Sequence, residues 1–408
     1  MSLSVVHIVG VVNKDDVLFD IISSLCICMY DKGILQNIVT FQSDLHFLGN
    51  VEIHTFSNFC NKTKADFKSL LTAVQADVIH IHGCWDKRLM LCEKWAKESG
   101  LYSVVSPYGA LNPEIMRINF FPQRIMNLML FQYKAIKEAG CVVACSSLEY
   151  ITLYELNWNQ AIISLKNPKI EPTCTYMQLC QSLISIYEKV VATYSPLFIS
   201  SHALKVVSSL LYVGAAPDNK SIYLNEDYLN AIRETKDKEW RTISLYGELH
   251  GINNIMKKAL QRLHFDRMLD VCKPEDRLRS VKPLNTDRIN FEHLIYTDLV
   301  ANHKLLNIAP GMEKTILIMM LNIRHEYQKG QLSLRHLTEM YATLRYNDFD
   351  ENLFGHLLEQ FSLRKFASHI EAILHFTCFL EEGYMPIPPT KDKKAVHMKQ
   401  NILSITIK

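Results

Sequence analysis

The sequence predicts an α/β fold, with a Rossmann-like parallel sheet in residues 1–170 followed by a mostly helical region. In the first 170 residues, short apolar runs alternate with longer segments of helical periodicity. The short runs are apolar at every position rather than at every second one, which is typical of parallel strands covered on both faces. Beyond residue 170 only helical spacing recurs, so we expect no second sheet there.

The elements of the first part follow in order along the chain. We expect strands at residues 4–10, 35–41, 51–56, 77–83, 102–109, 141–147 and 161–167. We expect helices at residues 15–33, 64–75, 86–100 and 122–139, with one more after residue 147. Ligands of open α/β sheets bind beyond the carboxyl ends of the strands. Residues 80–85, 106–112 and 146–149 should therefore converge on one rim, although they are far apart in sequence.

The second part divides at polar linkers. We predict a helical region at 171–275, a helical C-terminal domain at 276–390 and a loosely ordered tail at 391–408. Ser333 precedes an apolar periodic run and is a candidate helix cap. The apolar segment 315–323 is too short to span a bilayer, which needs about 20 residues, and predicts a buried helix.

Composition narrows the class of partner. The 408 residues carry a formal net charge of +2, which gives no general attraction to nucleic acid. We therefore expect the partners to be small molecules, lipid-linked groups or other proteins. The first residues lack a basic segment and a cleavage site of small residues, so we expect a cytoplasmic protein whose 11 cysteines are reduced. Residues 120–137 combine aromatic and basic side chains, which suits either peripheral membrane contact or a helix facing the core.

The stretch Ala-Asp-Val-Ile-His-Ile-His-Gly-Cys-Trp at residues 76–85 ends a predicted strand with two histidines. Such a pair is suited to metal binding, to catalysis beside a phosphate, or simply to the end of a buried strand. We expect His80 to face the core and His82 either to end the strand or to reach a cleft. The sequence shows no third ligand near the pair, so it predicts no metal site.

The order of these motifs resembles the acceptor-side domain of family 4-like glycosyltransferases of the GT-B fold. The stretch at 76–85 is followed by Ser-Pro-Tyr-Gly-Ala-Leu-Asn-Pro-Glu at 106–114, then by a helical zone and the apolar strand before Ser146. The resemblance covers about residues 1–170 and leaves the C-terminal half unmatched.

The resemblance implies transfer of a sugar from a nucleotide-sugar donor to a surface glycan or lipid-linked saccharide precursor, with no further cofactor. Such transfer requires an oriented acceptor hydroxyl and groups that stabilise the departing diphosphate. His82 is the candidate catalytic residue. The candidate substrate-binding residues follow the strand ends: Gly83, Trp85, Ser106, Tyr108, Gly109, Asn112, Glu114 and Ser146.

Several departures from the family pattern support an alternative, a catalytically inactive relative that acts as a binding or assembly module. The glycine-rich loop expected after the first strand has only Gly10, and Tyr108 stands where the family often has His or Arg. No second nucleotide-binding α/β domain is predicted. The pairs Glu226/Glu234 and Glu351/Glu359 match a donor-site spacing but are expected to be carboxylates on helix surfaces. Residues 244–254 form either a small polar site or a helix start.

Overall fold

The computed structural model describes residues 3–12, 17–57, 59–112, 114, 131–269 and 273–407. It divides into two compact units. The first unit comprises residues 1–198 and 273–280, and the second comprises residues 199–272 and 281–408. Each unit has its own core and is described separately.

The first unit is an α/β domain, and the predicted fold class is confirmed. Its strands are β1 (Ser4–Val9), β2 (Leu35–Thr40), β3 (Phe47–Leu48), β4 (Val51–Thr55), β5 (Val78–His82), β6 (Ser103–Ser106), β7 (Cys141–Ala144) and β8 (Ile162–Ser164). Its helices are α1 (Val17–Tyr30), α2 (Asn61–Ala73), α3 (Lys87–Glu98), α6 (Tyr133–Glu138), α7 (Ser147–Leu156) and α8 (Tyr176–Tyr194), with short 3-10 turns at Ser195–Phe198 and Pro274–Asp276.

Within the described residues the strands form one 8-stranded sheet in the order β3-β4-β2-β1-β5-β6-β7-β8. Every pairing is parallel except that of the short strand β3 with β4. After β1 the chain builds outward through β2 and β4, then returns to place β5 on the other side of β1. The carboxyl ends of β1 and β5 therefore flank the point where the strand order reverses, which is the usual ligand position in such sheets.

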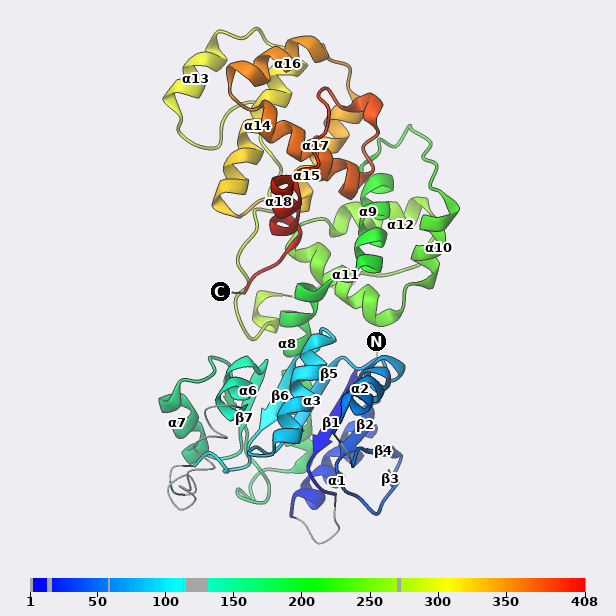
Figure 1. Ribbon diagram of the computed structural model, residues 1–408, viewed down its shortest axis with the longest axis vertical. Coiled ribbons are helices and arrows are strands. Elements are labelled where there is room, and N and C mark those ends of the chain that lie inside the picture. Colours follow the sequence, from blue (N-terminus) through cyan, green and yellow to red (C-terminus); the bar gives the residue numbers. More distant parts are fainter. Residues whose placement is uncertain are drawn as a thin grey trace. The chain divides into compact units, whose positions relative to one another are not determined.

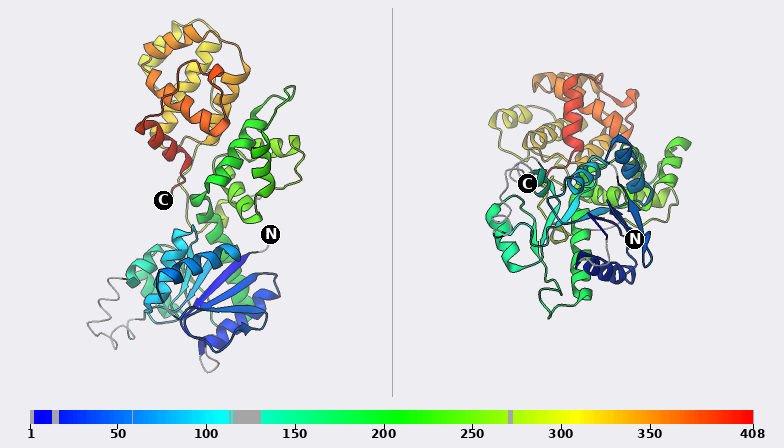
Figure 2. Two further views of the ribbon diagram at one scale, coloured as in Figure 1. Left: turned by 45° about the vertical axis from the view of Figure 1, so that its right-hand side comes forward. Right: turned by 60° about the horizontal axis from the view of Figure 1, so that its bottom comes forward.

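The two faces of the sheet are covered by different helices (Figure 1). On one face, Val6, Ile8, Ile79 and Ile81 pack into a core that includes side chains of α2, α3 and α6. On the other face, Val9 and Ile38 pack against α1. Helices α1 and α8 lie side by side there (Figure 2). Burial on both faces explains why the strands carry apolar residues on both faces rather than only at alternate positions.

Helix α8 belongs to the first unit, whereas the helical region was expected to begin at residue 171. Its buried side chains, among them Leu183 and Tyr187, cover the sheet face that α1 leaves open. Membrane contact was suggested for residues 120–137, of which 120–130 lie outside the described residues. The described end, α6, buries Ala135 and Ile136 in the core.

A short segment, residues 273–280, returns from the second unit to the first. The backbone amide of Leu278 donates to Thr193 Oγ1 at 2.8 Å, and Arg279 Nη2 donates to Asn159 Oδ1 at 2.8 Å. Asn159 is buried, and its amide nitrogen also donates to the carbonyls of Ile136 and Ala139. The first unit is thus built from two separate stretches of chain.

The second unit is helical. Its helices are α9 (Ser201–Ala215), α10 (Glu226–Glu234), α11 (Asp237–Leu249), α12 (Asn253–Arg262), α13 (Leu299–Leu306), α14 (Met312–Lys329), α15 (Leu334–Tyr346), α16 (Glu351–Gln360), α17 (Arg364–Cys378) and α18 (Lys393–Leu403), with a 3-10 turn at Glu382–Tyr384. Among the described residues of this unit, extended pairing is limited to one isolated bridge, between Val281 and Ile407. The absence of a second sheet from these residues agrees with the prediction.

Helix α9 is the centre of this unit and contacts α10, α11, α12, α15 and α17. It approaches α12 so closely that a Cβ atom on Gly214 would lie 2.1 Å from the carbonyl oxygen of Ile255. Only glycine fits at that crossing. Helix α14 is buried along residues 316–323, as predicted for the apolar segment. The predicted tail contains α18, whose Ala395, Met398 and Ile402 are buried.

No single helix within the described ranges is long and apolar enough to cross a membrane. Among the described residues, one pair of consecutive helical stretches, Tyr176–Phe198 and Ser201–Ala215, reaches the required length and composition when the two are taken together.

Helix α3 buries one carboxyl group against the sheet. Glu93 is 6% exposed; its Oε1 accepts from Ser103 Oγ at 2.6 Å, and its Oε2 has no partner within the described residues. Burial raises the pKa of Glu93 to about 8, against the smaller opposing effect of the Ser103 hydrogen bond. The folded state therefore holds a proton that the unfolded chain releases at lower pH.

We expect the Glu93→Gln variant to be more stable than the wild-type protein at pH 8 and nearly equal to it at pH 5. The folded carboxyl has the raised pKa, so its contribution is present below the unfolded pKa and is lost as the pH rises toward 8. The slope is about 1.4 kcal/mol per pH unit at most. Urea unfolding followed by circular dichroism from pH 5 to pH 8 measures this difference. Glu188→Gln, at an exposed position of α8, is the control and should follow the wild-type profile. Parallel profiles for wild type and Glu93→Gln would contradict the prediction.

Candidate functional site

The carboxyl ends of β5, β6 and β7 form the predicted rim. Strand β5 ends at His82 and β6 at Ser106, and these two residues are register partners. The amide of Gly83 donates to the carbonyl of Ser106 at 2.8 Å, which carries the pairing one residue past the strand. Ser146 follows β7 and caps α7 by accepting from the amide of Glu149.

Glu149 joins two of the predicted segments at this rim. Its carboxylate is fully buried and accepts from the amide of Gly109 at 2.5 Å and from the amide of Cys145 at 2.7 Å. Burial raises the pKa of Glu149, and the two amide hydrogen bonds oppose that rise. Its place in the first turn of α7 also favours a negative charge. The convergence of residues 106–112 with residues 146–149 is thereby confirmed.

Two bulky residues in the rim loops adopt left-handed backbone conformations, with φ of 69° at Trp85 and 53° at Tyr108. Such conformations cost about 1–3 kcal/mol and persist only where the surroundings fix them. Trp85 is fixed by two hydrogen bonds, its amide to Gln132 Oε1 at 2.7 Å and its indole nitrogen to the carbonyl of Ala110 at 2.9 Å. Strain that is held in this way clusters at binding and catalytic sites.

Tyr108 covers His82. The phenol of Tyr108 lies 2.8 Å from His82 Nδ1, and the two rings are stacked at an angle of 15°. His82 is only 1% exposed, which favours the alternative in which it ends the buried strand over the one in which it reaches a cleft. Burial lowers the pKa of His82 well below its ordinary value, and the neighbouring His80 and His7 lower it further. His82 is thus a neutral imidazole beneath the rim.

His80 faces the core as predicted. It is fully buried, with Nδ1 2.6 Å from the hydroxyl of Tyr187 on α8 and Nε2 2.8 Å from Ser106 Oγ. Because successive side chains of a strand alternate, His80 and His82 lie on the same face of the sheet, with ring centroids 4.0 Å apart.

A third histidine, His7, lies beside this pair and was not predicted from the sequence. His7 on β1 is the register partner of His80, and its Nδ1 lies 3.0 Å from His82 Nε2. One ring nitrogen from each of His7, His80 and His82 lies within 4.8 Å of the others, a geometry that could hold a metal ion. In the sequence, the clue to this cluster is His7, a histidine in the middle of the otherwise apolar strand 4–10. The cluster can be recognised only when β1 and β5 are known to be neighbouring strands.

The remaining residues that were predicted to bind substrate lie at the end of β6 and in the loop that follows it. Ser106 is buried, Gly109 and Asn112 are half-buried, and Glu114 is exposed. The amide of Asn112 donates to the carbonyl of Gly109 at 2.9 Å, while Asn112 Oδ1 is buried without a partner among the described residues. Residues 113 and 115–130, which follow directly, lie outside those residues.

Asn167 and the donor-spaced carboxylates of the second unit have structural roles or lie on helix surfaces. Asn167 is buried and its side chain accepts from the amide of Lys169 at 3.0 Å, which is a turn contact. Of the loop after β1, residues 13–16 lie outside the described residues. The carboxylates Glu226, Glu234, Glu351 and Glu359 are exposed on α10 and α16, as predicted.

Residues 244–254 form the end of α11 and the start of α12. His250 is fully buried there, and its Nδ1 accepts from the amide of Leu334 at 3.2 Å. Asn253 donates to the carbonyl of Ser244 at 3.1 Å. These contacts favour the helix-start interpretation over a polar site.

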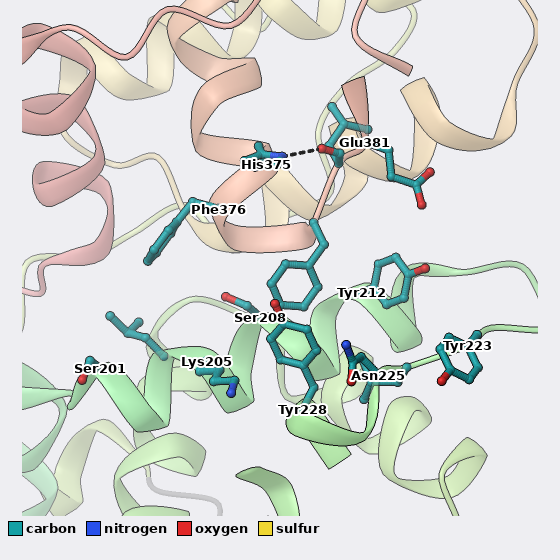
Figure 3. Close-up of a pocket in the computed structure, with 14 residues that line it drawn as sticks. Ser201, Lys205, Ser208, Tyr212, Tyr223, Asn225, Tyr228, His375, Phe376 and Glu381 are labelled. Carbon is teal, nitrogen blue, oxygen red and sulfur yellow. Dashed lines mark hydrogen bonds between the residues drawn. The ribbon is translucent and has the colours of Figure 1, made fainter. Parts of the chain in front are cut away.

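The second unit contains a pocket that the sequence did not indicate. It has a volume of about 740 Å³, within the range of small-molecule sites, and lies among α9, α10 and the end of α17 (Figure 3). Tyr212, Tyr228 and Phe379 line it, with Tyr228 and Phe379 ring centroids 4.7 Å apart. Phe379 has a φ of 54°, and Lys205 lies over the Tyr228 ring at 4.9 Å. Aromatic side chains that line a pocket can stack on a sugar ring or a planar ligand.

Comparisons with known proteins found similar solved structures but no matching family. No protein-family model matches the sequence, and no curated protein matches it. One similar solved structure is UDP-N-acetylglucosamine 2-epimerase from Rickettsia bellii, at a TM-score of 0.30 and 11% identity, covering 45% of this chain and 48% of that one. This chain thus spans about half the length of that enzyme. Another is a candidate UDP-N-acetylglucosamine 2-epimerase from Listeria monocytogenes, at a TM-score of 0.32 and 9% identity, covering 65% and 88%. Because these TM-scores and identities are low, the fold is assigned from the strand order of this chain's own sheet.

We expect Glu149→Ala to destabilise the first unit, because two buried backbone amides lose their acceptor. Each unsatisfied amide costs about 1–3 kcal/mol. Hydrogen exchange should be faster at the amides of Gly109 and Cys145 than in the wild-type protein, and the denaturant midpoint should fall. Glu155→Ala, at an exposed position of the same helix, is the control. Unchanged exchange at both amides would show that Glu149 does not hold the two loops together.

Proposed function

We propose that the protein is glycosyltransferase-like and binds a nucleotide sugar and a saccharide at the carboxyl rim of β5, β6 and β7. The observation that carries this proposal is the joining of the three motif segments at one rim. Gly83 is bonded to Ser106, and Glu149 holds both Gly109 and Cys145. The motif order supports the same family, whose transferases act on nucleotide sugars.

The burial of His82 changes its predicted role. A side chain that is 1% exposed does not touch a substrate at the rim. We therefore assign His82 as a positioning residue that holds the phenol of Tyr108 from below. We propose instead that Tyr108, Trp85 and Asn112, which are half-buried at the rim, contact the ligand.

The second candidate is a catalytically inactive relative that binds a saccharide or a partner. Two observations favour it. The described residues of the second unit form no sheet, so the usual donor-binding α/β domain of such transferases has no counterpart there. The aromatic pocket of that unit instead offers a separate small-molecule site.

The first experiment is a thermal-shift screen of the full chain with UDP-, GDP- and dTDP-sugars. Saturation at about 100 times Kd stabilises a protein by about 2.7 kcal/mol, so a bound nucleotide sugar should raise Tm by several degrees. Asn112→Ala should reduce that shift, because it removes a half-buried polar side chain from the rim. Asn302→Ala, at an exposed position of α13, is the control and should retain the shift.

The outcome separates the two candidates. A shift together with release or transfer of labelled sugar supports a transferase, whereas a shift without turnover supports the inactive relative. No response to any of the nucleotide sugars would overturn the proposal of a nucleotide-sugar site.

A further inference from the structure

Three buried imidazoles lie together on one face of the central sheet. The parallel register pairs His7 with His80, and His82 lies two residues further along β5 on the same face. All three are at most 1% exposed, and one ring nitrogen of each lies within 4.8 Å of the other two. The closest pair, His7 Nδ1 and His82 Nε2, is 3.0 Å apart.

Each of these rings also has an outer partner. His80 Nδ1 lies 2.6 Å from the hydroxyl of Tyr187, and His82 Nδ1 lies 2.8 Å from the hydroxyl of Tyr108. His7 Nε2 and Gln36 Oε1 are both buried without another partner in the described part of the chain. Gln36 also raises the pKa of His7 through a side-chain hydrogen bond, although less than burial lowers it. His80 and His82 thus each have one ring nitrogen held by a tyrosine hydroxyl, and such an outer hydrogen bond is common at metal-binding histidines.

We propose that His7, His80 and His82 are three ligands of a divalent transition-metal site of the zinc type. Zinc accepts imidazole ligands at 2.0–2.1 Å in tetrahedral geometry, which sets neighbouring ligand nitrogens about 3.3 Å apart. The His7–His82 separation of 3.0 Å is close to that spacing. Ser106 Oγ, 2.8 Å from His80 Nε2, supplies an oxygen beside the cluster for the fourth position.

The surroundings suit an imidazole-bound ion. Metal binding requires unprotonated histidine, and burial lowers the pKa of His7 to about 4 and those of His80 and His82 well below their ordinary value. The alternative is a metal-free network in which a single proton links His7 to His82. That network needs no ion, so a chelator would not change the stability of the protein.

The bound ion would be structural rather than catalytic, because its ligands are closed off from solvent. It would hold β1 and β5 together from the side of α8. Through the Tyr108 hydrogen bond it would also fix the loop after β6. This site does not depend on which ligand binds at the rim.

The test uses the full chain, stripped with a chelator, loaded with Zn²⁺ and dialysed. We expect about one zinc per chain by elemental mass spectrometry, and a ligand-field spectrum of four-coordinate Co²⁺ after cobalt loading. X-ray absorption of the zinc-loaded wild-type protein should show three imidazole ligands at about 2.0–2.1 Å. This measurement needs no variant, so it decides the question even if substitutions in the cluster prevent folding.

Variants then assign the ligands. His7→Gln and His82→Gln should lose the bound metal and the cobalt spectrum. Tyr187→Phe keeps all three ligands and removes only the outer partner of His80, so it should weaken zinc affinity on the order of 10-fold. His250→Gln is matched for burial in the second unit, and His54→Gln lies on β4 of the same sheet. Both controls should bind zinc as the wild type does.

The proposal is overturned if the wild-type chain retains no zinc after dialysis. It is also overturned if folded His7→Gln and His82→Gln retain zinc as the wild type does. X-ray absorption dominated by sulfur ligands would have the same meaning, because the metal would then be held elsewhere by cysteine.

Discussion

The parallel pairing of β1 with β5 is the constraint on which the rest of the first unit depends. Its register brings His7 beside His80 in the layer between the sheet and α8, where water is excluded. Buried polar rings need partners, because an unpaired polar group in a dry layer costs free energy. Tyr187, Ser106 and Tyr108 provide these partners from three different elements. The polar contacts of the central sheet thereby set the positions of α8 and of the loop after β6.

The rim above this layer has a different construction. There the contacts are mostly from side chain to backbone: Glu149 accepts from two loop amides, and Trp85 is held through Gln132 and the carbonyl of Ala110. Such contacts fix the backbone of a loop while leaving its outward side chains available. A rim of this kind is rigid at its base and variable at its surface, as expected for binding loops on an α/β scaffold.

Much of this organisation follows from local sequence patterns. The seven expected strands of the first part all occur, since runs of apolar β-branched residues between turn residues are a local signal. The convergence of residues 106–112 and 146–149 followed from the rule that parallel strands end at one edge. The cluster of three histidines did not follow, because it requires the register between strands separated by about 70 residues. The sequence left open whether His82 is buried for a related reason, since its burial depends on the left-handed turn at Tyr108 that places a phenol over the ring. The pocket around Phe379 joins α9 to a segment more than 150 residues later, so no window of sequence shows it.

The return of residues 273–280 to the first unit has a consequence for synthesis of the chain. Domains generally fold as units while the polypeptide emerges from the ribosome. Arg279 completes the hydrogen bonds of the buried Asn159, and Leu278 bonds to α8, so the α/β unit lacks these contacts until residue 280 has emerged. By then α9–α12 have already been made, so they can begin to pack while the α/β unit still lacks the hydrogen bonds of Leu278 and Arg279. The two units therefore fold during overlapping periods of synthesis rather than one after the other.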